Sequence, residues 1–231
     1  MSSLSSVYAV LASGVEVRAE VERKKSRFLA VLRQADSAEE AQAILDDLRR
    51  DHHTARHHCS AWAIGPDRRI QRANDDGEPS GTAGAPMLEA LTKAQMPTGE
   101  QDLSDVVAVV VRWFGGTLLG AGGLVSAYSD AVLAALGQAE AQEGFVTRQR
   151  MRQFTLAAPI VEAGRWENEL RGSRITVLGT DYAASPGSAV LNLAVADDER
   201  SVAELHRRTA SLSSGSAELS ESGLNWVDAQ C

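Results

Sequence analysis

Cysteine is scarce in this sequence: its 231 residues include two, Cys59 and Cys231, and they form no C-x-x-C pair. Two isolated cysteines supply neither the ligand spacing of a zinc ribbon nor the several bridges on which small secreted domains depend. The first residues also lack a basic segment followed by an apolar one, so we expect no signal peptide. This pattern is typical of a protein from the reducing cytoplasm.

Long hydrophobic runs and an excess of basic residues are also absent. No apolar stretch reaches the ~18–20 residues that a membrane helix needs, so we expect no membrane partner. Asp and Glu number 31 against 23 Lys and Arg, which gives a net charge of −8 at pH 7. This balance argues against a broadly basic nucleic-acid binder. Local basic patches remain at 23–27 and 49–58, and we favour solvated faces for both.

The order of the predicted elements indicates an α+β protein with two domains. In the first, Ser37 and Glu40 form a capping box that begins a helix. The run at 105–113 is apolar and β-branched throughout, which is typical of a strand buried on both faces. The other elements predicted in this domain are strands at 15–23, 26–34, 57–65 and 68–74 and helices at 83–95 and after residue 123.

A polar boundary near residues 139–149 precedes a second pattern. There the sequence predicts strand 150–158, helix 162–171, strand 173–182, strand 188–196, helix 198–209 and strand 216–227. This β-α-β-β-α-β order is the ferredoxin-like split βαβ arrangement. We therefore predict domains at residues 1–142 and 147–231.

The most unusual stretch is VVVRWFGGTLLGAGGLVSAYSDAVLAAL, which lies between a predicted buried strand and a helix. Five glycines fall within nine residues of it: Gly115, Gly116, Gly120, Gly122 and Gly123. Glycine permits positive φ, and bare N–H groups beside a helix N-terminus can hold an anion. Ala121 and Gly122 stand where a P-loop has Lys and Ser or Thr, and Val125 replaces the third Rossmann glycine. Neither nucleotide-binding motif is therefore present.

Two interpretations of this glycine-rich loop remain open. The glycines either form an anion site or let a helix of small residues pack tightly on the sheet, and we give the two equal weight. Arg112 shifts the balance slightly toward function. It interrupts an apolar strand beside the loop, where a charge must find water, a carboxylate or a ligand anion.

A second glycine-rich loop, NDDGEPSGTAGAP, begins at Asn74. Thr82, or Ser80, is placed to cap the helix that follows. Its acidic residues are Asp75, Asp76 and Glu78. Carboxylates suit hard cations, but D-D-G-E does not have EF-hand spacing, and Asp-Gly and Glu-Pro are common turn pairs. We favour turn-forming roles over a metal site.

The sequence HHTARHHC, which ends at Cys59, collects possible zinc ligands. Adjacent histidines on a strand point to opposite faces, and no second ligand cluster occurs elsewhere. We therefore expect one buried structural histidine with exposed partners. A Cys–His nucleophile pair would lack a third orienting group, so we predict no catalytic residue, no metal and no cofactor.

Four motifs together resemble the YigZ/IMPACT family: KKSRFLA at 24–30, HHCSAW at 57–62, DDGEPSGTAGAPML at 75–88 and VVRWFGGTLLGAGGLVSAYSDA at 110–131. They cover most of the first domain, and the second is similar to the ferredoxin-like domain of bacterial members. The resemblance implies a ribosomal protein S5 domain 2-like first domain with a left-handed βαβ crossover. It also implies a second domain like domain V of elongation factor G.

The resemblance further implies a cytoplasmic regulator of translation that binds RNA or a ribosome-associated partner. Eukaryotic relatives restrain the initiation-factor kinase that answers amino-acid starvation, by competing for its activator. The negative charge and Ser126, where members commonly carry Arg, favour the alternative of a protein-binding module without nucleic-acid contact. A third alternative is an enzyme acting on a phosphorylated small molecule, for which no convincing nucleophile or base is found.

We expect the two glycine-rich loops to lie together and to form one anion-binding floor. The candidate residues for binding an anion, RNA or a partner are Lys24, Lys25, Arg27, Asp76, Glu78, Ser80, Thr82, Arg112, Gly115, Gly116, Gly120, Gly122 and Gly123.

Overall fold

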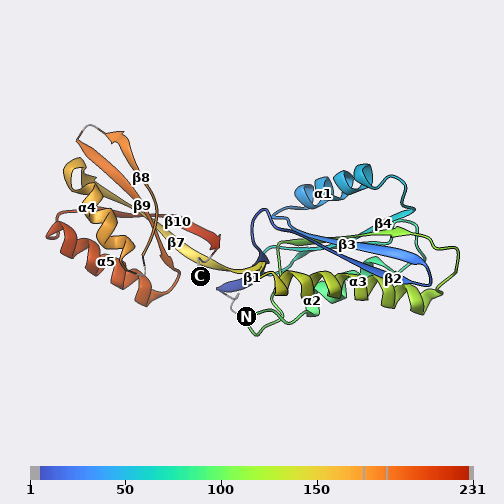
Figure 1. Cartoon of the computed structure of the whole chain (residues 1–231). Coiled ribbons are helices and arrows are strands. Elements are labelled where there is room, and N and C mark those ends of the chain that lie inside the picture. The colour runs from blue at the N-terminus through green and yellow to red at the C-terminus, as the bar shows by residue number, and fades with distance from the viewer. Residues whose placement is uncertain (1–5, 174, 186, 229–231) are drawn as a thin grey trace. The chain divides into compact units, whose positions relative to one another are not determined.

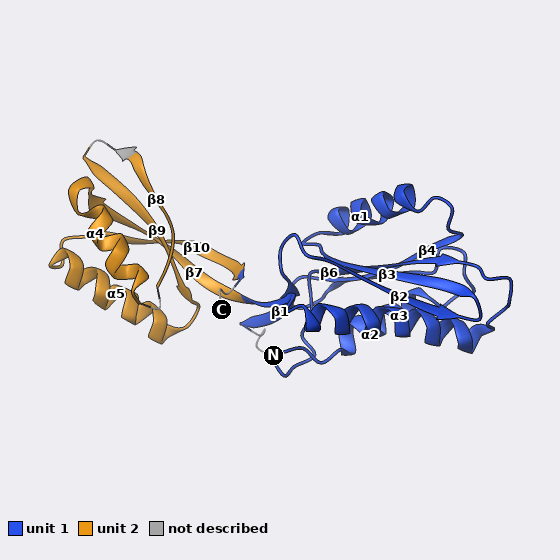
Figure 2. Cartoon of the chain, in the orientation of Figure 1, with its two compact units in different colours: residues 1–148, 228–231 blue, residues 149–227 orange. Residues whose placement is uncertain are grey.

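The computed structural model describes residues 6–173, 175–185 and 187–228. The chain divides into two compact units, one of residues Met1–Arg148 with Asp228–Cys231 and the other of residues Gln149–Val227 (Figure 2). Arg148, the last residue of the first unit before the chain enters the second, is bound by three carboxylates. Its Nη1 donates to Asp36 and Asp105, at 3.0 and 2.8 Å, and its Nε donates to Asp228 at 2.7 Å.

The first unit is a five-stranded sheet between two helical layers. The sheet has the order β2-β3-β6-β4-β5, and its neighbouring strands are antiparallel. Helix α1 covers one face, and α2 and α3 cover the other (Figure 1). The elements are β1 (Val7–Leu11), β2 (Glu16–Arg23), β3 (Ser26–Gln34), α1 (Ala38–Asp51), β4 (His57–Ile64), β5 (Ile70–Asn74), α2 (Gly84–Lys93), β6 (Val106–Trp113) and α3 (Ala121–Ala141).

Strand β6 is the central strand of this sheet, and the prediction that both its faces are buried is confirmed. Its odd-numbered residues from 107 to 111 pack with the apolar face of α1. Its even-numbered residues from 106 to 110 belong to the core beneath α2 and α3. The continuous apolar run reflects two covered faces rather than the parallel pairing with which such runs are usually associated.

Ser37 caps α1 as predicted, while the reciprocal bond of Glu40 goes to the amide one residue before the N-cap. The Glu40 amide donates to Ser37 Oγ at 3.1 Å, and the Asp36 amide donates to Glu40 Oε2 at 2.8 Å. The predicted cap of α2 is wrong. Neither Thr82 nor Ser80 caps this helix; the Asp75 carboxylate accepts from the amides of Ala83 and Gly84 instead.

The second unit has the predicted β-α-β-β-α-β order. Strand β9 lies between β7 and β8, β10 pairs with β7, and the two helices cover an apolar core. The elements are β7 (Phe145–Pro159), α4 (Ile160–Arg171), β8 (Thr176–Ser185), β9 (Ser188–Ala196), α5 (Glu199–Ser213) and β10 (Leu219–Asp228). The prediction of a two-domain α+β protein is confirmed. Among the described helices, none combines the length and the apolar character needed to cross a bilayer.

Candidate functional site

The two glycine-rich loops lie together, as predicted. A cavity of about 370 Å³ is lined by Gly77, Glu78 and Pro79 of the first loop and by Phe114, Leu118, Leu119 and Gly120 of the second. Arg56 and His57, the N-terminal residues of α3 and Arg112 complete the lining. The β2–β3 turn, the β6–α3 connection and the start of α3 lie at the same end of this unit (Figure 1).

A buried ion pair forms the base of this cavity. Arg112 is 5% exposed and Glu78 is 9% exposed. The Arg112 guanidinium donates to Glu78 Oε1 and, at 3.4 Å, to Ser26 Oγ, while its Nε has no partner among the described residues. Two buried charges of opposite sign are tolerated when each is paired and hydrogen-bonded. The charge that interrupts β6 therefore finds its carboxylate within the protein.

Tyr128 of α3 binds the same carboxylate oxygen. Its hydroxyl donates to Glu78 Oε1 at 2.8 Å, and its ring packs edge-on against Phe28 with the centroids 5.2 Å apart. Burial raises the pKa of Tyr128, so the phenol keeps its proton and acts as a donor. Arg112 of β6 and Tyr128 of α3 thus both donate to Glu78 Oε1, which joins the strand and the helix to the first loop.

Cys59 lies beneath the first loop and is fully buried. Its Sγ donates to the Asp75 carbonyl at 3.1 Å. Burial raises the pKa of the Cys59 thiol. Because the thiolate is the nucleophilic form, this cysteine is suited to packing rather than to covalent catalysis.

The two aspartates of the first loop hold its backbone. Asp75 accepts from the amides of Gly81, Ala83 and Gly84 at 2.7–3.0 Å. Burial alone would raise the pKa of Asp75, but these three bonds outweigh it and lower the pKa. Asp76 accepts from Arg49 at 2.8 Å and from a β4 backbone amide at 2.7 Å. Both carboxylates therefore act as parts of the turn.

The neighbouring histidines of β4 divide as predicted into one buried structural residue and one partly exposed residue. His58 is 7% exposed, its Nε2 lies 3.2 Å from the His52 carbonyl, and burial lowers its pKa. His57 Nδ1 lies 2.8 Å from the Asp76 carbonyl, which can only accept. His57 therefore carries its proton on Nδ1, and its Nε2 lies 3.9 Å from Glu78 Oε1 beside the cavity.

The glycines of the second loop serve different purposes. A Cβ at Gly115 would lie 2.0 Å from the carbonyl carbon of Lys25, so only glycine lets the loop pack on the β2–β3 turn. Gly116 and Gly120 have φ values of 84° and 75°, which favour glycine. Gly122 and Gly123 lie in the first turn of α3, which no side chain caps. Gly115 is thus required for close packing of the loop on the β2–β3 turn, while an anion site at the start of α3 stays a prediction.

The predicted cations differ in how far they are neutralised. Arg27 donates two hydrogen bonds to Glu20, at 3.0 and 2.8 Å, and lies over the Trp113 ring. Lys24 and Lys25 form the β2–β3 turn, are exposed, and make no ion pair with a described residue. Of the hairpin cations, the two lysines are therefore the ones free to meet a ligand.

The remaining candidates of the first loop lie apart from the buried ion pair. Ser80 is exposed, whereas Thr82 is 6% exposed and donates to the Pro79 carbonyl at 2.6 Å. Ser126 is exposed on α3.

Sequence reasoning missed the apolar residues at the cavity mouth. Phe114 is 42% exposed and Leu118 is 81% exposed, and both line the cavity together with Leu119. Large apolar side chains inside a glycine-rich surface loop were the available signal, because loops without a binding role are usually polar there. Arg56 was also missed, since it lies inside a run of histidines and arginines.

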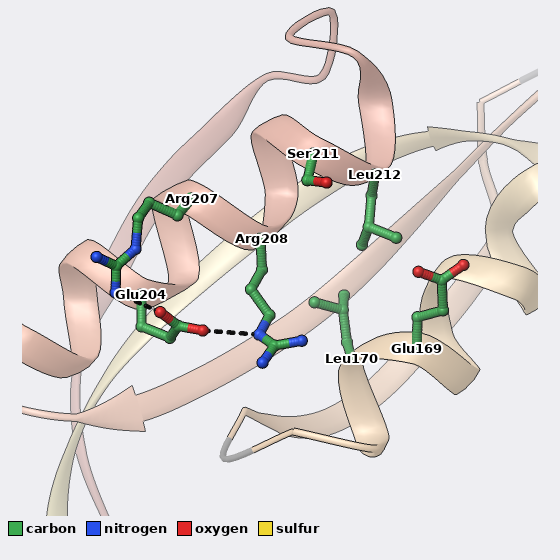
Figure 3. A pocket seen from close by; sticks show the side chains of 7 residues that line it. All are labelled: Glu169, Leu170, Glu204, Arg207, Arg208, Ser211 and Leu212. Atoms are coloured by element: carbon green, nitrogen blue, oxygen red, sulfur yellow. Dashed lines mark hydrogen bonds and ion pairs between the residues drawn. The ribbon is translucent and has the colours of Figure 1, made fainter.

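The second unit contains a hollow of a different kind, of about 210 Å³, between α4 and α5 (Figure 3). Leu170 and Leu212 line it, and Glu204 lies near its edge. Arg208 Nε donates to Glu204 Oε1 at 2.8 Å, and Arg207 binds the other carboxylate oxygen. These charges are exposed, so the pairs contribute little to stability.

This fold and site define a two-domain α+β protein whose first unit presents two joined glycine-rich loops. The family model of the Impact N-terminal domain matches residues 24–136. The IMPACT family member YigZ of Escherichia coli (strain K12) is 39% identical over 200 residues, which are 86% of this chain and 90% of the relative. The IMPACT family member YvyE of Bacillus subtilis (strain 168) is 43% identical over 163 residues, 71% and 70% of the two chains.

A solved structure agrees with these relatives. A crystal structure described as that of a hypothetical protein is 34% identical, with a TM-score of 0.61, and the match covers 94% of this chain and 98% of the other. The chain belongs to the IMPACT family.

Proposed function

We propose that this protein is a cytoplasmic regulator of translation that binds a ribosome-associated protein partner through the cavity between its two glycine-rich loops. One observation carries the choice of a protein over RNA. The mouth of the cavity exposes Phe114 and Leu118, while the arginine at its base is already neutralised by Glu78. Contiguous exposed apolar side chains mark protein-binding surfaces.

The role in translation is supported by family membership, since the family motifs are the loops that line this cavity. RNA is the second candidate, and the unpaired Lys24 and Lys25 favour it. Two cations are few for a protein whose affinity for RNA would rest on phosphate contacts. The net charge of −8 also disfavours approach to a polyanion.

The test is capture from a lysate of the source cells by the tagged full-length protein, with and without nuclease. The Leu118→Ala variant is compared with Leu224→Ala, which removes a similarly exposed leucine of the second unit, 57% exposed. We expect a ribosome-associated protein that survives nuclease, is lost with Leu118→Ala and is retained with Leu224→Ala. Capture that nuclease abolishes, or that both variants retain, would reject the proposal.

A further inference from the structure

We propose that the cavity accepts a large, uncharged apolar side chain of the partner, and that acidic residues flank this side chain in the partner's sequence. The inference rests on the proposed function, because it specifies the chemistry of the protein segment that binds there. It follows from the wall of the cavity, the state of its buried charges and the cations around its mouth.

The wall of the cavity is mainly apolar and is open to solvent. Pro79, Phe114, Leu118, Leu119 and Leu124 provide most of it, and Leu118 is 81% exposed in the free protein. Leu124 is 6% exposed and anchors the wall to the core beneath α3. An inserted aromatic or aliphatic side chain would remove apolar surface on both partners from water, as anchor residues of interfaces do.

The charges at the base select against a charged side chain. Arg112 and Glu78 neutralise each other, and Tyr128 already donates to the Glu78 oxygen that Arg112 binds. A charged group that reached this base would lose its hydration at a place where the two buried charges already compensate each other. An apolar group loses no hydration of this kind, so the anchor is expected to be uncharged.

Unpaired cations lie at the cavity and on the neighbouring β2–β3 turn, although the chain as a whole is acidic. Arg56 lines the cavity and is exposed, and its side chain makes no hydrogen bond or ion pair with a described residue. Lys24 and Lys25 lie on the turn whose backbone packs against Gly115 of the second loop. One unpaired cation that lines the cavity and two on the turn that packs against its second loop complement Asp or Glu beside an apolar anchor.

The backbone of the turn supports a use for these lysines outside the fold. Lys24 and Lys25 have φ values of 48° and 66°, a conformation that disfavours side chains with a Cβ. Asn-Gly is the pair that such two-residue turns favour. Two lysines in these positions weaken the turn, and their unpaired charges are available to a ligand.

The experiment selects short random peptides, displayed on phage, against the immobilised full-length protein. We expect the enriched peptides to share a Leu, Met, Phe or Trp with Asp or Glu beside it. A synthetic copy of the most enriched peptide should bind about tenfold more weakly to Leu118→Ala. Its affinity for Leu224→Ala should equal that for the wild type.

The charge part of the proposal is tested with the double variant Lys24→Asn, Lys25→Gly and with Arg56→Gln. Each should bind the same peptide several-fold more weakly at low salt and should reduce the salt dependence of binding. Enrichment of basic peptides, the absence of a shared pattern, or peptide binding that is insensitive to Leu118→Ala would overturn the inference. If the peptide test fails but capture from the lysate still depends on Leu118, the proposed function stands without this inference. If capture from the lysate does not depend on Leu118, both the proposed function and the inference are rejected.

Discussion

The two units each combine leucines with an Arg–Glu pair, yet the two pairs are held in opposite ways. In the first unit the Arg112 and Glu78 side chains are 6% and 5% exposed, and Glu78 is also fixed by Tyr128. In the second unit Glu204 and Arg208 are 38% and 50% exposed on the surface of α5 (Figure 3). Breaking a buried ion pair leaves an uncompensated charge inside the protein, which costs much free energy. The Arg112–Glu78 pair therefore fixes the position of the loop that carries Glu78. The second is a solvated pair on one helix face.

Removing the carboxylate from each pair should give the largest difference. Glu78→Ala leaves the Arg112 charge buried without a counter-ion and should destabilise the first unit by about 3–5 kcal/mol. Glu204→Ala should cost far less, because its arginines remain in water. Urea denaturation of the full-length chain, followed by circular dichroism, measures both losses. If the two variants lose the same free energy of unfolding, burial does not make the first ion pair more important for stability than the second.

The two aspartate caps offer a second comparison. Asp75 binds the start of α2 from eight residues upstream in the sequence, whereas Asp198 caps α5 directly through the Ser201 amide. Asp75→Ala should cost about 1–2 kcal/mol, since it releases three amides of a partly buried loop. Asp198→Ala should cost less, because water can replace the exposed cap. Thermal denaturation of both variants tests the ranking.

The pH dependence of the free energy of unfolding should change when the Asp75 carboxylate is replaced. The pKa of Asp75 is lowered on folding, so its stabilisation is fully present above the ordinary Asp pKa, about 3.9. The stabilisation is lost as the pH falls through the lower folded-state pKa. Asp75→Asn should therefore flatten the acid side of the stability curve. An unchanged slope below about pH 4 would contradict the role of this carboxylate.

Positive φ values at non-glycine residues provide a smaller test. Lys24→Asn with Lys25→Gly should stabilise the first unit by about 1 kcal/mol, because the turn then has residues suited to its backbone. Ser214, with a φ of 52° at the end of α5, is the matched position in the second unit, and Ser214→Gly should also stabilise. Destabilisation by the lysine variant would show that the lysine side chains support the fold.

The weakest expected effect concerns RNA. If single-stranded RNA binds at Lys24 and Lys25, the slope of log affinity against log salt should be about −1.4, or 0.7 for each phosphate contact. Ser126→Arg should steepen the slope by nearly one contact. Filter binding of a labelled single-stranded RNA across a salt series measures both. If neither the wild type nor Ser126→Arg binds the RNA in a salt-sensitive way, the RNA alternative is excluded.

The local pattern predicted those elements whose cause lies within a few residues. Ser37 and Glu40 identify the start of α1, and the run at 106–113 identifies the buried central strand. Arg112 was recognised because a charge is conspicuous in an apolar strand. Its partner was not identified, since Glu78 and Tyr128 lie far away in the sequence and only tertiary packing joins them.

The misplaced cap of α2 has the same explanation. Thr82 and Ser80 have the residue type and the position of a cap, whereas Asp75 reaches the helix only because the loop folds back on itself. The need for glycine at position 115 is equally non-local, because it arises from the Lys25 backbone on a different hairpin. Sequence pattern indicates that such a loop is special, and the fold determines what each residue of it contacts.

Each unit encloses an apolar core of its own, and the two cores share no residue. Most of the second unit follows the first in the chain, since it begins at Gln149. Domains with separate cores can exchange partners or accumulate core substitutions without unfolding each other. The architecture therefore allows the binding loops of the first unit and the helices of the second to change independently during evolution.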